Sequence, residues 1–191
     1  MNQDPFKEYI RESEPNKREK GYAWQTAIGL QAVDGLKTSK YLINTAIRNI
    51  EGDISIDEAN SLLNSYYEKN PKQDPGDRTE EADKVSVRIV KVLSETGFSF
   101  TPNEYISIHK KLFTGIYRHA GKIRDYNITK KEWVLDGETV LYGNASELRD
   151  TLEYDFSEER SFSYKGLSIN EIIHHLAVFV SRLWQIHIFG E

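Results

Sequence analysis

SINEIIHHLAVFVSRLWQIHIFGE, residues 168–191, carries the strongest structural signal of the chain. Ser168 is followed three residues later by Glu171, which is a capping-box pattern and predicts the start of a helix. Apolar residues then recur at helical spacing for about 16 residues, so the helix is expected to have one broad apolar face. Directly after it come a histidine, a phenylalanine and a glutamate in the pattern H-x-F-x-E, which begins at His187.

The composition favours a packed globular protein, because 38% of the 191 residues are hydrophobic and 12% are aromatic. This length can bury one good core, or one core with a small accessory module. The absence of cysteine excludes disulfides, thiolate zinc sites and cysteine nucleophiles. A formal charge of −5 argues against a general nucleic-acid binder, although it is compatible with a small nucleotide ligand.

The chain shows no sign of a membrane or secretory segment. No apolar run approaches the length of a membrane span, and residues 1–5 lack the basic and apolar stretches of a secretory signal. A cytoplasmic protein with no membrane contact is therefore expected.

The pattern along the chain predicts a mainly α fold with two parts. Residues 1–20 are strongly charged and have little periodicity, so they are expected to form a loose lead-in. Two prolines and a glycine within residues 70–77 mark the best linker, which divides the chain into domains 1–75 and 76–191. Helical spacing and caps predict helices within residues 21–52, 55–70, 79–93, 105–113, 147–156 and 169–186.

One β-hairpin is expected to interrupt the helices. Two β-prone runs, residues 133–135 and residues 139–142, flank the pair Asp136-Gly137. Asp-Gly is a preferred pair for a tight hairpin turn, so the two runs are predicted to pair with each other.

Several segments together resemble the Fic family, whose signature is H-x-F-x-[D/E]-G-N-x-R. The resemblance covers roughly residues 78–191, and it implies a Fic-type helical core with one β-hairpin flap. In addition to the H-x-F-x-E pattern at residues 187–191, the segments that carry it are 108–113, 117–124 with an A-G-x-x-R turn, and 127–130.

The resemblance implies a protein adenylyltransferase, which transfers AMP from ATP to a hydroxyl side chain of a target protein. His187 then corresponds to the catalytic base, a task that suits a side chain with an unperturbed pKa of about 6.5. Gly190 and Glu191 fall at ATP-binding positions, and the carboxylate of Glu191 is expected to help hold Mg²⁺. Phe189 corresponds to a buried anchor, and Ile188 stands where many members have proline.

The hairpin resembles the flap on which family members align their target. A target segment is expected to dock there by β-strand addition, with main-chain hydrogen bonds that position the acceptor hydroxyl. The residues expected to contact the target are Lys130, Lys131, Trp133, Val134 and Leu135.

The N-terminal part resembles the inhibitory module of Fic toxin–antitoxin proteins. Residues 44–52 are similar to the inhibitory helix, whose pattern is [S/T]-x-x-x-E-[G/N], and residues 55–67 resemble the helix after it. The resemblance implies that Glu51 pairs with a motif arginine and blocks the γ-phosphate position of ATP. Ile47 departs from the pattern where serine or threonine is expected. We therefore expect autoinhibition by a module that packs over the nucleotide cleft.

The second half of the signature, G-N-x-R, does not follow Glu191 in this sequence. Those residues would supply phosphate-binding amides and arginines, so the 191-residue chain is expected to be inactive. It is either a fragment of a longer gene product, which is favoured, or a natural remnant. Two alternatives remain open: a Fic-like enzyme that transfers another phosphate-containing group or removes AMP, and a non-catalytic protein-binding module. Whether the protein forms a homodimer is also left open.

The other histidines are expected to have structural roles. Glu171 and His174 form one copy of the E-x-x-H spacing that di-iron helix bundles need twice. His174 and His175 are adjacent and should point to different helix faces, which argues against a shared metal. His109 and His119 are expected to be structural as well.

Overall fold

The structure is a computed structural model of the chain, and it describes all residues except 1–3, 72–73, 75, 132–135 and 191. The chain divides into two compact units, residues 1–97 and residues 98–191, and each is described by itself below. The predicted domain boundary between residues 75 and 76 falls inside the first unit, between its last two helices.

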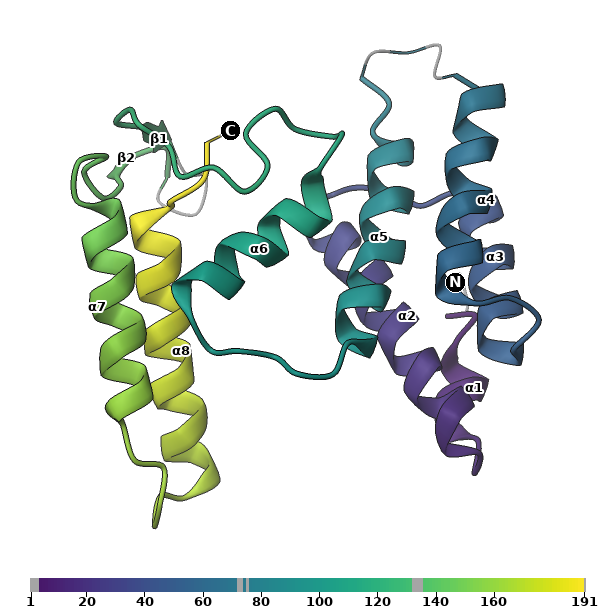
Figure 1. The fold of residues 1–191 in the computed structure, drawn as a ribbon, viewed down its shortest axis with the longest axis horizontal. Helices are drawn as coiled ribbons and strands as arrows, with labels where there is room; N and C mark the ends of the chain where they lie inside the picture. The colour runs from purple at the N-terminus through teal and green to yellow at the C-terminus, as the bar shows by residue number, and fades with distance from the viewer. Residues whose placement is uncertain (1–3, 72–73, 75, 132–135, 191) are drawn as a thin grey trace. The chain divides into compact units, whose positions relative to one another are not determined.

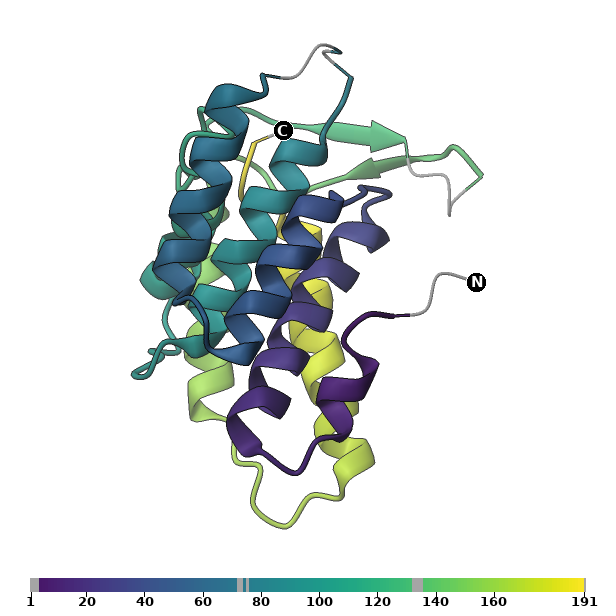
Figure 2. The ribbon, with the colours of Figure 1, turned by 90° about the vertical axis from the view of Figure 1, so that its right-hand side faces the viewer.

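The first unit is helical in its described part (Figures 1 and 2). Helix α2 packs against α1, α3 and α5, and α4 packs against α3 and α5. The helices are α1 (Lys7–Arg11), α2 (Pro15–Val33), α3 (Lys40–Glu51), α4 (Ile56–Lys69) and α5 (Thr79–Ser94).

Local signals set the ends of these helices. The Ser39 side chain accepts a hydrogen bond from the main chain at the start of α3, and Gly52 ends that helix with a φ of 91°. A left-handed residue at this position is the usual helix stop, and glycine adopts it without a steric penalty. Ser55 and Glu58 form the predicted capping box of α4.

A single apolar core holds the first unit together. Asn49 is buried within it, and its side chain accepts a hydrogen bond from Trp24 Nε1 and donates one to the Ile54 carbonyl. Because both polar ends of the amide are used, its burial leaves no unsatisfied group. The buried core residues are Phe6, Trp24, Ala27, Leu42, Ala46, Ile50, Leu63, Val87 and Val90.

The prediction of a loose lead-in over residues 1–20 is wrong. This segment contains α1 and the first turns of α2, and the Phe6 side chain is only 2% exposed. Gly21 lets the two helices approach closely, because a Cβ there would lie 3.0 Å from the Cβ of Tyr9. A buried aromatic anchor, rather than local periodicity, therefore orders the segment.

The second unit combines helices with a small hairpin (Figure 1). Helices α7 and α8 lie side by side, and the hairpin lies beyond the end at which α8 stops. Apolar side chains of α7 and α8 form its core together with Ile188, and α6 packs against it through Tyr105 and Ile106. The elements are α6 (Pro102–Phe113), β1 (Thr129–Lys131), β2 (Thr139–Leu141), α7 (Leu148–Ser161) and α8 (Ile169–Ile186).

The hairpin exists as predicted, but its described ladder involves a different first strand. Strands β1 and β2 pair antiparallel, with Lys130 opposite Val140. Asp136 and Gly137 have φ values of 53° and 85°, the left-handed conformation expected for the turn. The run at residues 133–135, predicted as the first strand, lies outside the described residues.

The mainly helical fold with one hairpin thus agrees with the fold class predicted from the sequence. None of the helices in the described part of the chain has the length and apolarity needed to cross a lipid bilayer.

Candidate active site

His187 lies directly after α8 in an unusual backbone conformation. Its φ of 43° and ψ of 65° are left-handed, and its N–H donates to the Leu183 carbonyl. A residue other than glycine adopts this conformation at a cost of about 1–2 kcal/mol, so neighbouring contacts must hold it there. The half-buried imidazole packs against the buried Tyr142 ring, with the centroids 4.7 Å apart.

Arg124 supplies several of those contacts. Its side chain is 4% exposed, and its Nε donates to the His187 carbonyl at 2.8 Å. The same guanidinium donates to the carbonyls of Ile186, Tyr126 and Gly143. Burial lowers the pKa of Arg124 below its ordinary value, but guanidinium groups remain charged in proteins. A buried cation therefore lies at the carbonyl end of α8, where the helix dipole favours it.

A short bridge aligns the segment after α8. Ile123 pairs antiparallel with Phe189, and the Arg124 N–H donates to the Ile188 carbonyl at 2.9 Å. The Ile188 side chain is 1% exposed within the core of the second unit. The residues around His187 are consequently held by main-chain bonds on one side and apolar burial on the other.

His109 supports the same segment from α6. Its ring stacks on Phe189 with centroids 3.6 Å apart, and its Nδ1 accepts a hydrogen bond from the Gly121 N–H at 2.9 Å. Burial, with a smaller contribution from the charge of His119, lowers the pKa of His109 to about 4. The ring is therefore neutral near pH 7, as its role as an acceptor requires. This supports the expected structural role of His109.

Two open hollows lie near the end of α8, and His187 lines one of them. One, of about 450 Å³, is lined by His187 together with apolar and aromatic side chains that include Tyr105 and Phe189. The other, of about 620 Å³, lies between β2 and the end of α8 and is lined by Tyr142, Gly143 and Gln185. Trp184 lines both, and half of its surface is exposed. Space for a ligand therefore exists on both sides of Trp184.

The residues predicted to dock a target lie only partly within the described structure. Lys130 and Lys131 belong to β1, and both are exposed. Trp133, Val134 and Leu135 lie outside the described residues.

Gly190 is buried beside Tyr126. A Cβ at this position would lie 2.7 Å from the Tyr126 hydroxyl, so a larger residue would displace that ring. Glu191, the expected Mg²⁺ ligand, lies outside the described residues. Within the part of the chain that the structure describes, no group of three or more histidine or acidic side chains is arranged to hold a metal.

Glu51 ends α3 in the first unit and is not a simply solvated carboxylate. Its two oxygens accept hydrogen bonds from the Tyr9 hydroxyl and the Lys17 ammonium, each at 2.7 Å. The bond from Lys17, followed by that from Tyr9, lowers the pKa of Glu51. The side chain keeps 38% of its surface exposed. Ile47, which departs from the expected serine or threonine, packs against the core of this unit.

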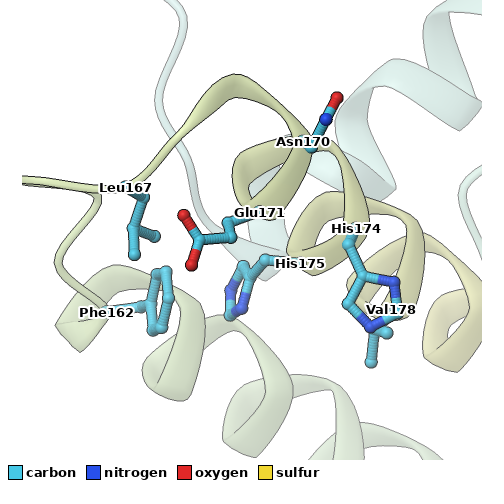
Figure 3. Close-up of a pocket in the computed structure, with 7 residues that line it drawn as sticks. All are labelled: Phe162, Leu167, Asn170, Glu171, His174, His175 and Val178. Atoms are coloured by element: carbon cyan, nitrogen blue, oxygen red, sulfur yellow. The ribbon is translucent and has the colours of Figure 1, made fainter.

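A third hollow, of about 530 Å³, lies away from His187 at the start of α8 (Figure 3). His174 and His175 both line it, but their rings point in different directions. His175 stacks on Phe162 and shares a 2.7 Å contact with the nearly buried Glu159. Packing thus accounts for His175, in line with the role expected for it.

Sequence reasoning missed the supporting roles of Arg124 and Tyr142. Arg124 was visible only as the last residue of the A-G-x-x-R turn, and its carbonyl partners Ile186 and His187 lie 62 and 63 residues away along the chain. Tyr142 was visible only as a member of a β-prone run. No local pattern could have paired either residue with His187.

The fold and the site define a mainly helical domain built around one histidine at a helix end, with a hairpin beside it. Residues 99–191 match the model of the Fic/DOC family, so this part of the chain is similar to Fic/DOC domains. The match supports a role as a transferase of the Fic type. Comparison with curated proteins and with solved structures found no match for the chain.

Proposed function

We propose that the Fic/DOC domain transfers AMP from ATP to a hydroxyl group of a target protein, with His187 as the general base. The observation that carries the proposal is the position of His187. It follows the longest helix described in the matched region, has a left-handed conformation and lines an open hollow. A histidine held in this way can accept a proton from a hydroxyl placed in the hollow that it lines.

The chemistry requires one proton transfer and one phosphoryl substitution. The imidazole of His187 takes the proton as the hydroxyl oxygen of a target tyrosine, threonine or serine attacks the α-phosphorus of ATP. The new oxygen–phosphorus bond forms as the bond to pyrophosphate breaks. A neutral imidazole near pH 7 is suited to this task because its unperturbed pKa is about 6.5.

Mg²⁺ fits the donor set that the sequence places after His187. This ion usually binds one or two carboxylates together with substrate phosphates, so the single carboxylate of Glu191 is a suitable ligand. When bound, Mg²⁺ would neutralise part of the charge on the phosphates. Gly190, whose buried position leaves no room for a side chain, would bring the main chain close to the nucleotide.

The hairpin β1–β2, which we call the flap, is proposed to align the target. It is a two-stranded sheet, so its ladder uses only one edge of each described strand. A strand at the edge of a sheet can add a further strand from another protein. The exposed side chains of Lys130 and Lys131 would then lie next to the bound segment, and so, we propose, would Trp133, Val134 and Leu135.

Glu51 is proposed to inhibit the reaction by occupying the place of the γ-phosphate. Its ionised carboxylate would compete for the same motif arginine and would repel the triphosphate. The first unit would then act as the regulatory part of the protein, as in the toxin–antitoxin proteins that it resembles.

The test uses a chain that continues through the complete H-x-F-x-E-G-N-x-R-x-x-R motif, incubated with α-labelled ATP, Mg²⁺ and a lysate of its source. His187→Ala should abolish labelling of target proteins while the circular dichroism stays unchanged, since a general base contributes at least ~10²-fold in rate. The control is His174→Ala, which removes an exposed histidine from the same helix. Activity of His187→Ala within a few-fold of the control would exclude His187 as the base.

The same assay separates the alternatives. Labelled UTP or CDP-choline in place of ATP would reveal transfer of UMP or phosphocholine. Release of label from a previously modified target would reveal removal of AMP. Calorimetry that detects no nucleotide binding, combined with capture of a target by the flap, would instead indicate a binding module.

A further inference from the structure

We propose that Arg124 positions His187 and the flap relative to one another, so that a hydroxyl presented by the flap meets the imidazole. This inference rests on the proposed function, because it assigns to Arg124 the alignment of the two parts that the reaction needs. Arg124 is a positioning residue, since its contacts are with the main chain around His187 and around the flap.

One set of bonds holds the segment that contains His187. The carbonyls of three consecutive residues, Ile186, His187 and Ile188, accept hydrogen bonds from Arg124 Nη2, Nε and the main-chain N–H, at 3.1, 2.8 and 2.9 Å. Carbonyls at the end of a helix have no partner within the helix. One arginine therefore satisfies the helix end and stabilises the left-handed conformation of His187.

A second set of bonds holds the two ends of the flap. Arg124 Nη1 donates to the Tyr126 carbonyl at 2.6 Å, and Nη2 donates to the Gly143 carbonyl. Tyr126 comes shortly before β1, and Gly143 comes shortly after β2. The Gly143 N–H also donates to the Gln185 carbonyl of α8 at 3.3 Å. The guanidinium thus lies between the base of the flap and the end of α8 and bonds to both.

The planar guanidinium is suited to this task in a way that lysine is not. Arginine has five N–H donors that point outward in one plane, whereas lysine has three donors on a single atom. An ammonium group could donate to the carbonyls at the end of α8 or to those at the ends of the flap, but it could not reach both sets. The 4% exposure of Arg124 also leaves little room for water to replace lost donors.

Geometry of this kind matters for the rate of transfer. A general base must come within about 2.6–3.2 Å of the proton it removes, and a displacement of about 1 Å can lower the rate by ~10²-fold. Loss of Arg124 should therefore reduce kcat for the target. The affinity for ATP should change little, because Arg124 is bonded to the protein main chain.

The first measurement needs no variant and uses the 191-residue chain. In ¹⁵N NMR spectra, a guanidinium fixed by several hydrogen bonds shows separate, slowly exchanging Nη signals. We expect such signals for Arg124, assigned by their nuclear Overhauser contacts to the Tyr126 and Gly143 regions. A single averaged Nη signal would overturn the proposal, whatever the activity of the protein.

The second measurement compares Arg124→Lys and Arg124→Met with Phe156→Leu in the same chain. Phe156 is a core residue of the second unit that packs against Phe100 and Phe179, so its variant controls for general destabilisation. Both Arg124 variants should change the imidazole resonances of His187, weaken its ring contact with Tyr142 and speed amide exchange at Gly143. Phe156→Leu should change none of these, and equal effects in all three variants would overturn the proposal.

The third measurement is kinetic and uses the chain with the complete motif. Arg124→Lys should lower kcat for the target about 10²-fold, with the ATP dissociation constant within threefold of the parent. Rescue of kcat to within threefold by lysine would overturn the proposal. If the parent transfers no AMP, the proposed function fails, while the NMR measurements still decide whether Arg124 holds His187 and the flap together.

Discussion

His109 and Phe189 stack almost parallel, with ring centroids 3.6 Å apart and ring planes within 4° of each other. The contact joins α6 to the segment that follows His187, and the Gly121 N–H fixes the histidine ring through Nδ1. Phe189 was expected to be an anchor, and its stacking partner is one of the histidines that were expected to be structural. The support of the candidate site therefore depends on a histidine that stays neutral.

The first prediction concerns the pH dependence that His109 introduces. Burial lowers its folded pKa to about 4, below the value of about 6.5 for an unfolded chain. The unfolded state therefore takes up a proton first, and the stability from neutral His109 is present above pH ~6.5 and is lost as the pH falls towards 4. Because the ring is partly solvated, the loss should be about 1–2 kcal/mol.

The measurement is urea unfolding at pH 7 and pH 4.5 for the parent and for His109→Asn. Asparagine keeps an acceptor near the position of Nδ1 but does not titrate in this range. The parent should lose about 1–2 kcal/mol more than the variant between the two pH values. Equal losses would show that His109 has an ordinary pKa in the folded protein.

The second prediction concerns Gly121, where a side chain would introduce both backbone strain and a steric clash. Its φ is 70°, and a Cβ there would lie 2.5 Å from the Cβ of Lys110 in the last turn of α6. Gly121→Ala should therefore lower the free energy of unfolding by about 2–4 kcal/mol, through backbone strain and a contact that cannot relax easily.

Gly115 provides the matched control for Gly121. Its φ is 78°, but a Cβ there would meet nothing within 4 Å. Gly115→Ala should cost only the strain of the left-handed conformation, about 1–2 kcal/mol. If the two variants unfold at the same urea concentration, the contact with Lys110 is not as close as the structure has it.

The third prediction concerns Asp83, a fully buried carboxylate in the first unit. It accepts hydrogen bonds from the Ser39 main chain, the Ser39 hydroxyl and the Tyr67 hydroxyl. Asp83→Asn should destabilise the unit by about 1–3 kcal/mol, because an amide N–H₂ in place of Oδ2 would remove the acceptor of the Ser39 and Tyr67 hydroxyls. Thermal unfolding monitored by circular dichroism checks this, with Asp57→Asn on the exposed surface as the control.

The fourth prediction concerns Glu51 and regulation. If Glu51 occupies the γ-phosphate position, Glu51→Gly in the chain with the complete motif should raise ATP affinity and auto-AMPylation together. Charge-assisted hydrogen bonds contribute on the order of 1.5–3 kcal/mol. Loss of even the lower figure implies about a tenfold increase in ATP affinity and in the rate of auto-AMPylation. The control is Asp53→Gly, which removes an exposed acidic residue from the turn after α3.

Equal rates for parent, Glu51→Gly and Asp53→Gly would require the inhibitory role to be withdrawn. In that case the bonds from Tyr9 and Lys17 would give Glu51 a structural task, which is to tie α1 and α2 to the end of α3. A lower melting temperature of Glu51→Gly alone would identify this second role.

Elements with local start and stop signals could be predicted from the sequence. The capping boxes at Ser55 and Ser168 and the cap at Thr101 begin helices as predicted, because each signal lies within four residues of the backbone it satisfies. His187 was placed correctly at the end of its helix for the same reason. Its left-handed conformation was not foreseen, since it depends on bonds from Arg124.

Features that depend on distant partners could not be predicted. The helices within residues 1–20 are ordered by burial of Phe6 in a core whose other members lie farther along the chain. The ladder between β1 and β2 pairs residues at 129–131 that have no strong β pattern of their own. In both cases the structure is stabilised by contacts with residues that are distant along the chain, and a local sequence pattern does not reveal such contacts.

The tryptophans give each compact unit its own optical signal. Trp24 is fully buried in the first unit and hydrogen-bonded to Asn49, whereas Trp184 is half exposed beside the candidate site in the second. Emission from Trp24 should be blue-shifted and inaccessible to iodide, while emission from Trp184 should be red-shifted and readily quenched. In a Trp133→Phe background, fluorescence could therefore report on the first and the second unit separately within one unlabelled molecule.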